Sequence, residues 1–345
     1  MNITTQYWKL STNVTEHDPA VREAAELLCQ QQVVAFPTET VYGLGGDATN
    51  EAAVQRIFDA KGRPADNPLI VHVADKSQVE ELVSSIPPIA HKLMDNFWPG
   101  PLTLILPSKG TAASNVTAGL PTIAIRMPNH AVALSILTAT GKPLAAPSAN
   151  RSGRPSPTEA VHVSQDLDGR IAGIVDGGPT GVGLESTVLD CTAEIPIILR
   201  PGGVTKEDLQ PFIPNIIIDP ALANQETQPK SPGMKYTHYA PEAPLWLVDG
   251  NGEFFQNQVN QLKATDKRVG VIASSELAAE LDHNKVLSCG SKQNLTEVAG
   301  NLYGALRQFK KSDIDVILCE TFPEHGVGAA IMNRLTKAAV QKVSQ

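Results

Sequence analysis

The chain has 345 residues, of which 42% are hydrophobic and 5% aromatic, a composition that suits a folded protein of two domains with at least one large core. Its net charge of −8 argues against a protein whose main task is to coat nucleic acid, because such proteins are usually basic overall. No apolar run approaches the ~18 residues that a membrane span requires, and Met1 to Leu10 lack the basic and apolar regions of a signal peptide.

The cysteine pattern gives a second exclusion. The four cysteines are scattered and form no C-x-x-C pair, which argues against both a cysteine zinc site and a disulfide framework. We therefore expect a cytoplasmic protein with reduced thiols. The cysteines are Cys29, Cys191, Cys289 and Cys319.

Helices and strands are predicted to alternate through the first 214 residues. We predict helices over residues 18–30, 50–60, 77–83, 89–97 and 130–138, a short helix capped by Thr205, and strands over 33–36, 69–73, 102–106, 122–126, 144–147, 174–176, 186–190 and 197–200. Thr49 or Asn50 is expected to cap the second helix. This interleaving predicts an α/β or α+β domain with a mixed sheet.

The composition changes after residue 214. Residues 225–230 are polar and show no periodicity, as a linker would. Three short apolar strands follow at 245–248, 269–273 and 316–319, with a helix at about 294–310 and another helix closing the chain. We therefore divide the chain into a larger α/β domain over 1–214, a linker over 215–241 and a smaller α/β domain with a Rossmann-like rhythm over 242–345.

The segment from Lys61 to His72 carries the strongest chemical signal. Lys61 offers a mobile point charge and Arg63 a rigid planar fork, a pair suited to a polyphosphate. Prolines on either side fix the backbone that presents them. The alternative, about equally plausible for these residues in isolation, is a pair of solvated cations at a helix C-terminus.

The run from Gly43 to Ala48 fits the pattern G-x-G-x-x-A after a strand and before a helix. Alone, this pattern suggests a dinucleotide-binding turn. We favour the alternative that the glycines allow tight turning beneath a pocket, because the preceding loop from Pro37 to Tyr42 is too polar for a bare phosphate turn.

Polar groups follow several predicted strands. Arg126 ends an apolar strand, where a charge needs a partner, either an external carboxylate or an internal acid. Ser148-Ala149-Asn150 is either an anion nest or an ordinary polar loop. Ser186 and Arg200 are also polar residues at strand ends beside glycines. His72 alone would more often be a core residue whose hydrogen bonds are satisfied. Together these strand ends predict one cleft for an anionic ligand.

Taken in order, these segments resemble the YrdC-like family in its long, two-domain form. The matching segments are Pro37–Leu44, Lys61–Pro64, Asn67–Leu69, Trp98–Thr103, Arg126–Pro128, Ser148–Gly153, Ser186–Thr187 and Arg200–Gly202. The linker segment Ser231–Pro241 matches the long form and is absent from single-domain members.

The resemblance implies a twisted mixed sheet with flanking helices and a nucleotidyltransferase activity. It implies that L-threonine, bicarbonate and ATP, with Mg²⁺, give L-threonylcarbamoyladenylate and pyrophosphate for the t6A37 modification of tRNAs that read ANN codons. It implies that Lys61 and Arg63 serve catalysis, that Arg63, Asn67, Thr122, Ser148, Ser156, Arg200 and Tyr239 hold ATP, and that Thr40, His72, Arg126, Ala146 (through its backbone) and Ser186 hold threonine. No metal ligand is expected from protein side chains, since Mg²⁺ would be carried by ATP.

Two other functions fit the sequence less well. A double-stranded RNA or tRNA-binding module is disfavoured by the charge of −8 and by the lack of an aromatic-rich stacking strand. A carbamoyltransferase that contains a YrdC-like domain would carry cysteine zinc fingers, and none is present. The expected partners are the three substrates and a downstream threonylcarbamoyl-transferase complex, with weak RNA binding left open. The loop from Glu320 to Gly328 is either a second ligand loop or, as we favour, a turn before the last helix.

Overall fold

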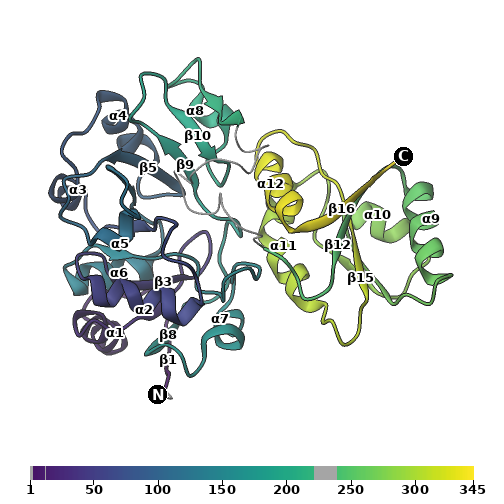
Figure 1. The fold of residues 1–345 in the computed structure, drawn as a ribbon, viewed down its shortest axis with the longest axis horizontal. Helices are drawn as coiled ribbons and strands as arrows, with labels where there is room; N and C mark the ends of the chain where they lie inside the picture. The colour runs from purple at the N-terminus through teal and green to yellow at the C-terminus, as the bar shows by residue number, and fades with distance from the viewer. Residues whose placement is uncertain (1–2, 12, 221–238) are drawn as a thin grey trace. The chain divides into compact units, whose positions relative to one another are not determined.

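Figure 1 shows the protein as a computed structural model that describes residues 3–11, 13–220 and 239–345. The chain divides into two compact units: Met1–Ser152, Pro157–Gly181 and Glu185–Tyr236 form the first, and Gly153–Ser156, Val182–Leu184 and Thr237–Gln345 form the second. The second unit thus takes two short segments from within the predicted first domain. The polar run 225–230 and most of the segment Ser231–Pro241 lie outside the described residues.

The first unit alternates helices and strands, as predicted. Its helices are α1 (Pro19–Cys29), α2 (Glu51–Lys61), α3 (Ser77–Leu82), α4 (Pro88–Phe97), α5 (Ser114–Thr117), α6 (Ala131–Thr140), α7 (Ala160–Leu167) and α8 (Lys206–Leu209). Its strands are β1 (Gln6–Lys9), β2 (Val34–Phe36), β3 (Gly43–Asp47), β4 (Ile70–His72), β5 (Leu102–Pro107), β6 (Thr122–Arg126), β7 (Leu144–Ala145), β8 (Gly173–Asp176), β9 (Thr187–Asp190), β10 (Ile197–Arg200) and β11 (Ile217–Ile218).

These strands form one mixed sheet. Within the described residues, its order is β1-β8-β2-β3-β7-β4-β6-β5-β9-β10-β11, and parallel and antiparallel pairs both occur. A large apolar cluster that includes Tyr42, Phe58 and Leu104 packs on this sheet, and a second cluster joins α1 and α6 to β2 and β8. The prediction of a twisted mixed sheet with flanking helices is confirmed.

Local capping explains the helix that leads into the site. The Asn50 side chain accepts a hydrogen bond from the Ala53 N–H, so Asn50 is the cap of α2. Gly62 ends the helix in the left-handed conformation, at φ 62°, which costs glycine little. Lys61 is therefore the last helical residue, and the chain turns sharply just after it.

The prediction that the glycines of the run from Gly43 to Ala48 allow tight turning was wrong. Residues Gly43–Asp47 form β3, which pairs antiparallel with β2 and with β7. A Cβ on Gly45 would lie 2.5 Å from Cε1 of Phe36, so the glycine is required by close packing against a neighbouring strand. Close packing within a sheet, and not a tight phosphate turn, accounts for this glycine.

The second unit holds a smaller parallel sheet. Its strands are β12 (Leu245–Asp249), β13 (Val269–Ala273), β14 (Val286–Ser288), β15 (Val316–Glu320) and β16 (Ala339–Ser344), in the order β14-β13-β15-β12-β16. Its helices are α9 (Gly252–Lys263), α10 (Ser275–Glu280), α11 (Leu295–Gln308) and α12 (Gly328–Ala338). The prediction that a helix closes the chain was wrong, because β16 follows α12 and pairs parallel with β12. The α/β rhythm of this unit is confirmed.

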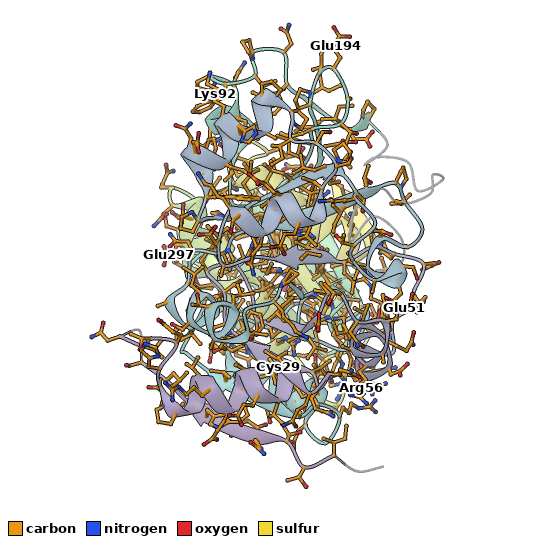
Figure 2. The ribbon with its side chains drawn as sticks, turned by 90° about the vertical axis from the view of Figure 1, so that its left-hand side faces the viewer. Cys29, Glu51, Arg56, Lys92, Glu194 and Glu297 are labelled. Atoms are coloured by element: carbon orange, nitrogen blue, oxygen red, sulfur yellow. The ribbon has the colours of Figure 1, made fainter. Side chains whose placement is uncertain are left out.

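Two further observations concern the whole chain. Every helix among the described residues is too short or too polar to cross a bilayer. The Cys29 side chain is exposed at the end of α1, where Figure 2 labels it, while Cys191, Cys289 and Cys319 are buried, and all four are free thiols. Burial raises the pKa of the Cys191 and Cys289 thiols to about 12, so both stay protonated at neutral pH.

Candidate active site

A row of polar side chains crosses neighbouring strands of the large sheet. His72 of β4 pairs with Arg126 of β6, and the antiparallel register of β5 continues the row to Thr103. Thr103 pairs with Val188 of β9, which pairs in turn with Arg200 of β10. Because paired residues share one face of a sheet, these side chains project to the same side.

Apolar residues lie beside this row. Ile70 and Ala124 stand two positions before His72 and Arg126, and Ile105 stands two positions after Thr103, so all three occupy the same face. They form a buried cluster with Val188 and Leu199. The face therefore combines cations with an apolar patch, as sites for small organic anions do.

The loop between β2 and β3 is fixed by the hydroxyl of Thr38. This hydroxyl donates to the carbonyl of Val41 at 2.7 Å and accepts from the backbone N–H groups of Thr40 and Val41. Because the Thr38 proton is used in this way, the 2.8 Å bond between the two threonine hydroxyls is donated by Thr40. The Thr40 oxygen then accepts a hydrogen bond of 2.9 Å from Nη1 of Arg126.

Arg126 also pairs with an acid that the sequence analysis did not select. Its Nη2 lies 3.1 Å from Oε2 of Glu39, and the two side chains are 3% and 12% exposed. Burial lowers the pKa of Arg126, and the charge of Glu39 opposes that effect. The guanidinium is thus held between Glu39 and Thr40, both from the loop after β2.

Four buried polar atoms around this pair lack hydrogen-bond partners. They are Oε1 of Glu39, Nδ1 of His72, Nε of Arg126 and Nδ1 of His130. Burial first, and then the charge of Arg126, lower the pKa of His72 well below its ordinary range, so the ring is neutral. Buried polar atoms are normally satisfied, so a group of unsatisfied donors and acceptors is the mark of a binding site.

Ser186 and Arg200 form the other end of the row. The Arg200 guanidinium donates from Nε and Nη2 to the Ser186 carbonyl, at 3.1 and 2.9 Å, and from Nη2 to the Ser186 hydroxyl at 3.1 Å. That hydroxyl shares a 2.7 Å hydrogen bond with Thr103. Arg200 is 5% exposed and Arg126 is 2% exposed, so neither cation points into bulk water.

Lys61 joins the end of α2 to the loop after β7. Its ammonium group donates to the backbone carbonyls of Ser148 and Asn150. Gly43 forms a β-bridge with Ser148, and the Leu44 N–H donates to Pro147, so this loop also rests on β3. The predicted phosphate-binding residues Lys61 and Ser148 therefore lie in direct contact.

Arg63 and Asn67 belong to the turn that follows α2. Nη2 of Arg63 donates to the backbone carbonyls of Asn67 and Pro68, at 3.2 and 3.3 Å. The Asn67 side chain is 1% exposed, yet neither its Nδ2 nor its Oδ1 has a hydrogen-bond partner. An amide with an unsatisfied donor and an unsatisfied acceptor suits a nucleobase or a similar polar ligand.

The remaining predicted site residues lie apart from these contacts. Thr122 begins β6, and the Ala146 N–H donates to the Ile70 carbonyl between β7 and β4. Ser156 and Tyr239 belong to the second unit, where the Tyr239 ring stacks on Tyr303.

The sequence analysis missed Glu39, Thr103 and His130 as site residues. Glu39 and Thr103 lie inside segments that carried the family resemblance, Pro37–Leu44 and Trp98–Thr103. Their place in these segments could have marked them as candidate site residues. His130 had no such signal. Among residues 3–11, 13–220 and 239–345, no three His, Cys, Asp or Glu side chains gather as a metal site would require.

Comparison with known proteins gives the family. Residues 26–202 match the family described as Telomere recombination, which comprises Sua5, YciO and YrdC proteins, and residues 204–340 match the family described as Threonylcarbamoyl-AMP synthase, C-terminal domain. The chain therefore belongs to the YrdC-like family, in its two-domain form, as the sequence analysis predicted.

Two curated relatives and one solved structure support this conclusion. The chain is 56% identical over 336 residues to the threonylcarbamoyl-AMP synthase of Bacillus subtilis, covering 97% of this chain and 96% of that protein. It is 46% identical to the enzyme of the same name from Pyrococcus abyssi, over 94% and 95% of the two chains. The crystal structure of P. abyssi Sua5 complexed with L-threonine superposes with a TM-score of 0.93 at 44% identity, covering 99% of this chain and all of that one.

Proposed function

We propose that this protein is an adenylyl-transferring enzyme that forms L-threonylcarbamoyladenylate and pyrophosphate from L-threonine, bicarbonate and ATP. The observation that carries this proposal is the buried Arg126, whose Nε lacks an acceptor inside a group of other unsatisfied polar atoms. Relatives that match nearly the whole chain bear the name of this activity, and a related structure was solved with L-threonine.

The chemistry needs no covalent enzyme nucleophile. The threonine amine forms a carbamate with bicarbonate, the carbamate oxygen attacks the α-phosphorus of ATP, and pyrophosphate leaves. Holding two substrates in line and stabilising negative charge supply most of such an acceleration. A face that carries Arg126 and Arg200 on neighbouring strands is suited to both tasks.

We assign the amino acid to the Arg126 end of the row. The Arg126 fork binds the carboxylate, and Thr40 and His72 lie beside it. Ser186, further along the row, and the Ala146 backbone are further contacts to the amino acid. Thr40 already accepts from Arg126, and Ser186 is linked to the row through Thr103. A guanidinium that is prepositioned by Glu39 and Thr40 loses little freedom when it binds a carboxylate.

We assign ATP to the residues of the α2 turn and the loop after β7. Arg63, Asn67, Thr122, Ser148 and Arg200 hold the nucleotide, Lys61 acts on the phosphates, and Ser156 and Tyr239 are further contacts. The unsatisfied Asn67 amide supports this assignment. Mg²⁺ would be brought by the nucleotide, as the counter-ion of its phosphates.

The biological role follows from the product. We propose that the product passes to a threonylcarbamoyl-transferase complex for the t6A37 modification of tRNA, in the cytoplasm, where the four free thiols would persist. A plain RNA-binding module is not favoured, since it would place its cations at the surface, and Arg126 and Arg200 are buried.

Pyrophosphate release tests the proposal. The purified protein, given ATP, Mg²⁺ and labelled bicarbonate, should release pyrophosphate and incorporate label only when L-threonine is present. Equal release with L-serine, or with no amino acid, would overturn the assignment.

A further inference from the structure

Glu39 presents one carboxylate oxygen inward with no partner. Its Oε2 is paired with Arg126 at 3.1 Å, whereas its Oε1 is buried and receives no hydrogen bond. The backbone around it is set by the Thr38 hydroxyl, which binds the N–H groups of Thr40 and Val41. A buried carboxylate oxygen without a donor is costly, so a ligand that brings a donor gains free energy there.

The neighbouring orphan atom requires the opposite kind of partner. Nε of Arg126 is a buried donor of a cationic group and needs an anionic acceptor. Because Glu39 and Arg126 are in contact at 3.1 Å, a ligand that satisfies both atoms carries an acceptor, best an anion, and a hydrogen-bond donor, best a cation, close to each other. The zwitterionic end of an α-amino acid has this arrangement, and its net charge of zero matches the neutral pair of Arg126 and Glu39.

Resting on the proposed function, we propose that Glu39 binds the α-ammonium group of the amino-acid substrate through Oε1 and accepts the proton that this group loses before carbamate formation. Arg126 holds the carboxylate of the same molecule. Glu39 is then a catalytic residue, because it touches the nitrogen that reacts.

The proton transfer balances as follows. The ammonium N–H bond breaks, its electron pair stays on nitrogen, and the proton moves to Oε1 of Glu39. The amine lone pair then forms the N–C bond with the carbon of bicarbonate, a C–O bond breaks, and one amine proton leaves with the departing oxygen as water. Glu39 returns its proton to solvent, so one bicarbonate is consumed, and one water and one proton are released, for each carbamate formed.

The charged and titratable groups around Glu39 come from three elements. Arg126 of β6 is the cation in contact with Glu39, and His72 of β4 lies beside Arg126. His130, just before α6, interacts electrostatically with the Glu39 carboxylate. Burial lowers the pKa of His130 and of His72, so both rings are neutral near pH 7. Glu39 is the one acidic side chain among these neighbours.

The test compares two ligands on the full-length protein. Calorimetric titration measures L-threonine and its analogue 2,3-dihydroxybutanoate, in which a hydroxyl replaces the ammonium group. Glu39→Gln keeps an oxygen for Arg126 but loses the charge. It should weaken L-threonine binding about tenfold or more and change the affinity of the analogue less than about twofold. Glu26→Gln, on the exposed face of α1, is the matched control and should change neither affinity.

The pH profile separates proton acceptance from binding. The turnover deficit of Glu39→Gln at saturating L-threonine should shrink as pH rises past the pKa of the threonine amine, because the amine then needs no base. A deficit that stays constant with pH, or equal weakening of both ligands by Glu39→Gln, would overturn this inference alone. A wild type without threonine-dependent pyrophosphate release would overturn the proposed function and this inference together.

Discussion

The ammonium group of Lys61, at the end of α2, donates a hydrogen bond of 2.7 Å to the backbone carbonyl of Asn150, 89 residues further along the chain. A second hydrogen bond reaches the carbonyl of Ser148. A lysine predicted to act on phosphates thus also fixes the loop that carries Ser148. The two roles are compatible, because a cation that draws two carbonyls together also places its charge beside the loop's hydroxyl and amide groups.

Lys61→Met should reduce both stability and activity. Methionine keeps most of the side-chain volume but leaves two carbonyls, one buried and one partly buried, without their charged donor, so we expect the free energy of unfolding to fall by about 2–4 kcal/mol. Urea denaturation measures this change. Lys76→Met is the control, because the Lys76–Asp95 pair is exposed and should contribute less than about 1 kcal/mol. An inactive Lys61→Met variant with unchanged stability would show that Lys61 serves only the phosphates.

Arg126→Ala should separate the two substrates. Loss of one charged contact to a carboxylate costs ~1.5–3 kcal/mol, so the KM for L-threonine should rise roughly tenfold to 150-fold, while the KM for ATP changes little. Initial rates of pyrophosphate release, with each substrate varied in turn, measure both. Arg22→Ala, on the exposed side of α1, should leave both constants unchanged. Equal increases for the two substrates would argue against a carboxylate site at Arg126.

Arg307→Met tests the assignment of Ser156 to ATP. Arg307 is 8% exposed, and its Nη2 donates to the carbonyl of Pro155, the residue before Ser156. Without this hydrogen bond, worth about 1 kcal/mol, the position of Ser156 is less restricted. The KM for ATP should rise several-fold, and the KM for L-threonine should change less.

Lys310→Met is the matched control for Arg307→Met. Arg307 lies in α11, and Lys310 lies just after the end of that helix. Lys310 pairs with Glu242, but its side chain is 43% exposed. This variant should behave as wild type in both assays. If Arg307→Met also leaves the ATP constant unchanged, Ser156 does not contribute to nucleotide binding through this contact.

Local patterns predicted most elements of the fold but missed what depends on distant packing. The cap at Asn50 and the strand that ends at Arg126 follow from short-range rules. The strand Gly43–Asp47 was missed because glycine is common in turns, and here Gly45 is explained by its close packing against Phe36 on another strand. The segment Gly153–Ser156 belongs to the second unit through contacts such as the one with Arg307, which no neighbouring residue signals.

Sequence patterns are limited in the same way for the candidate site, because they do not show which distant residues meet there. The sequence left two partners open for Arg126, an internal acid and an external carboxylate. The structure contains the internal acid, Glu39, and also leaves Nε of Arg126 for an external acceptor. Residue spacing cannot distinguish these alternatives, because the acid lies 87 residues earlier and meets Arg126 only through the order of β2, β3, β7, β4 and β6 in the sheet.

The buried carboxylate of Asp47, paired with the half-exposed Lys142, should make stability depend on pH. Asp47 lies at the end of β3 and is 2% exposed. Its Oδ2 lies 2.5 Å from the Lys142 ammonium. Its Oδ1 accepts hydrogen bonds from the backbone N–H and the hydroxyl of Thr49. Burial alone would raise the pKa of this carboxyl, but the hydrogen bonds from Lys142 and Thr49 outweigh it and leave the pKa below its ordinary value.

Because the pKa is lower in the folded protein, the unfolded state binds more protons as the solution is acidified. The stabilisation from Asp47 is therefore complete above the ordinary aspartate pKa of 3.8 and is lost as pH falls through the lowered value. Urea unfolding at pH 7, 5, 4 and 3 should show the difference between wild type and Asp47→Asn shrinking only at the acidic end. Asp95→Asn is the control. The exposed pair of Asp95 and Lys76 should lose its effect in 0.5 M salt, whereas Asp47, whose carboxylate is buried and also accepts two hydrogen bonds from Thr49, should keep most of its own. A difference that stays constant down to pH 3 would contradict the assignment of a charged, stabilising Asp47.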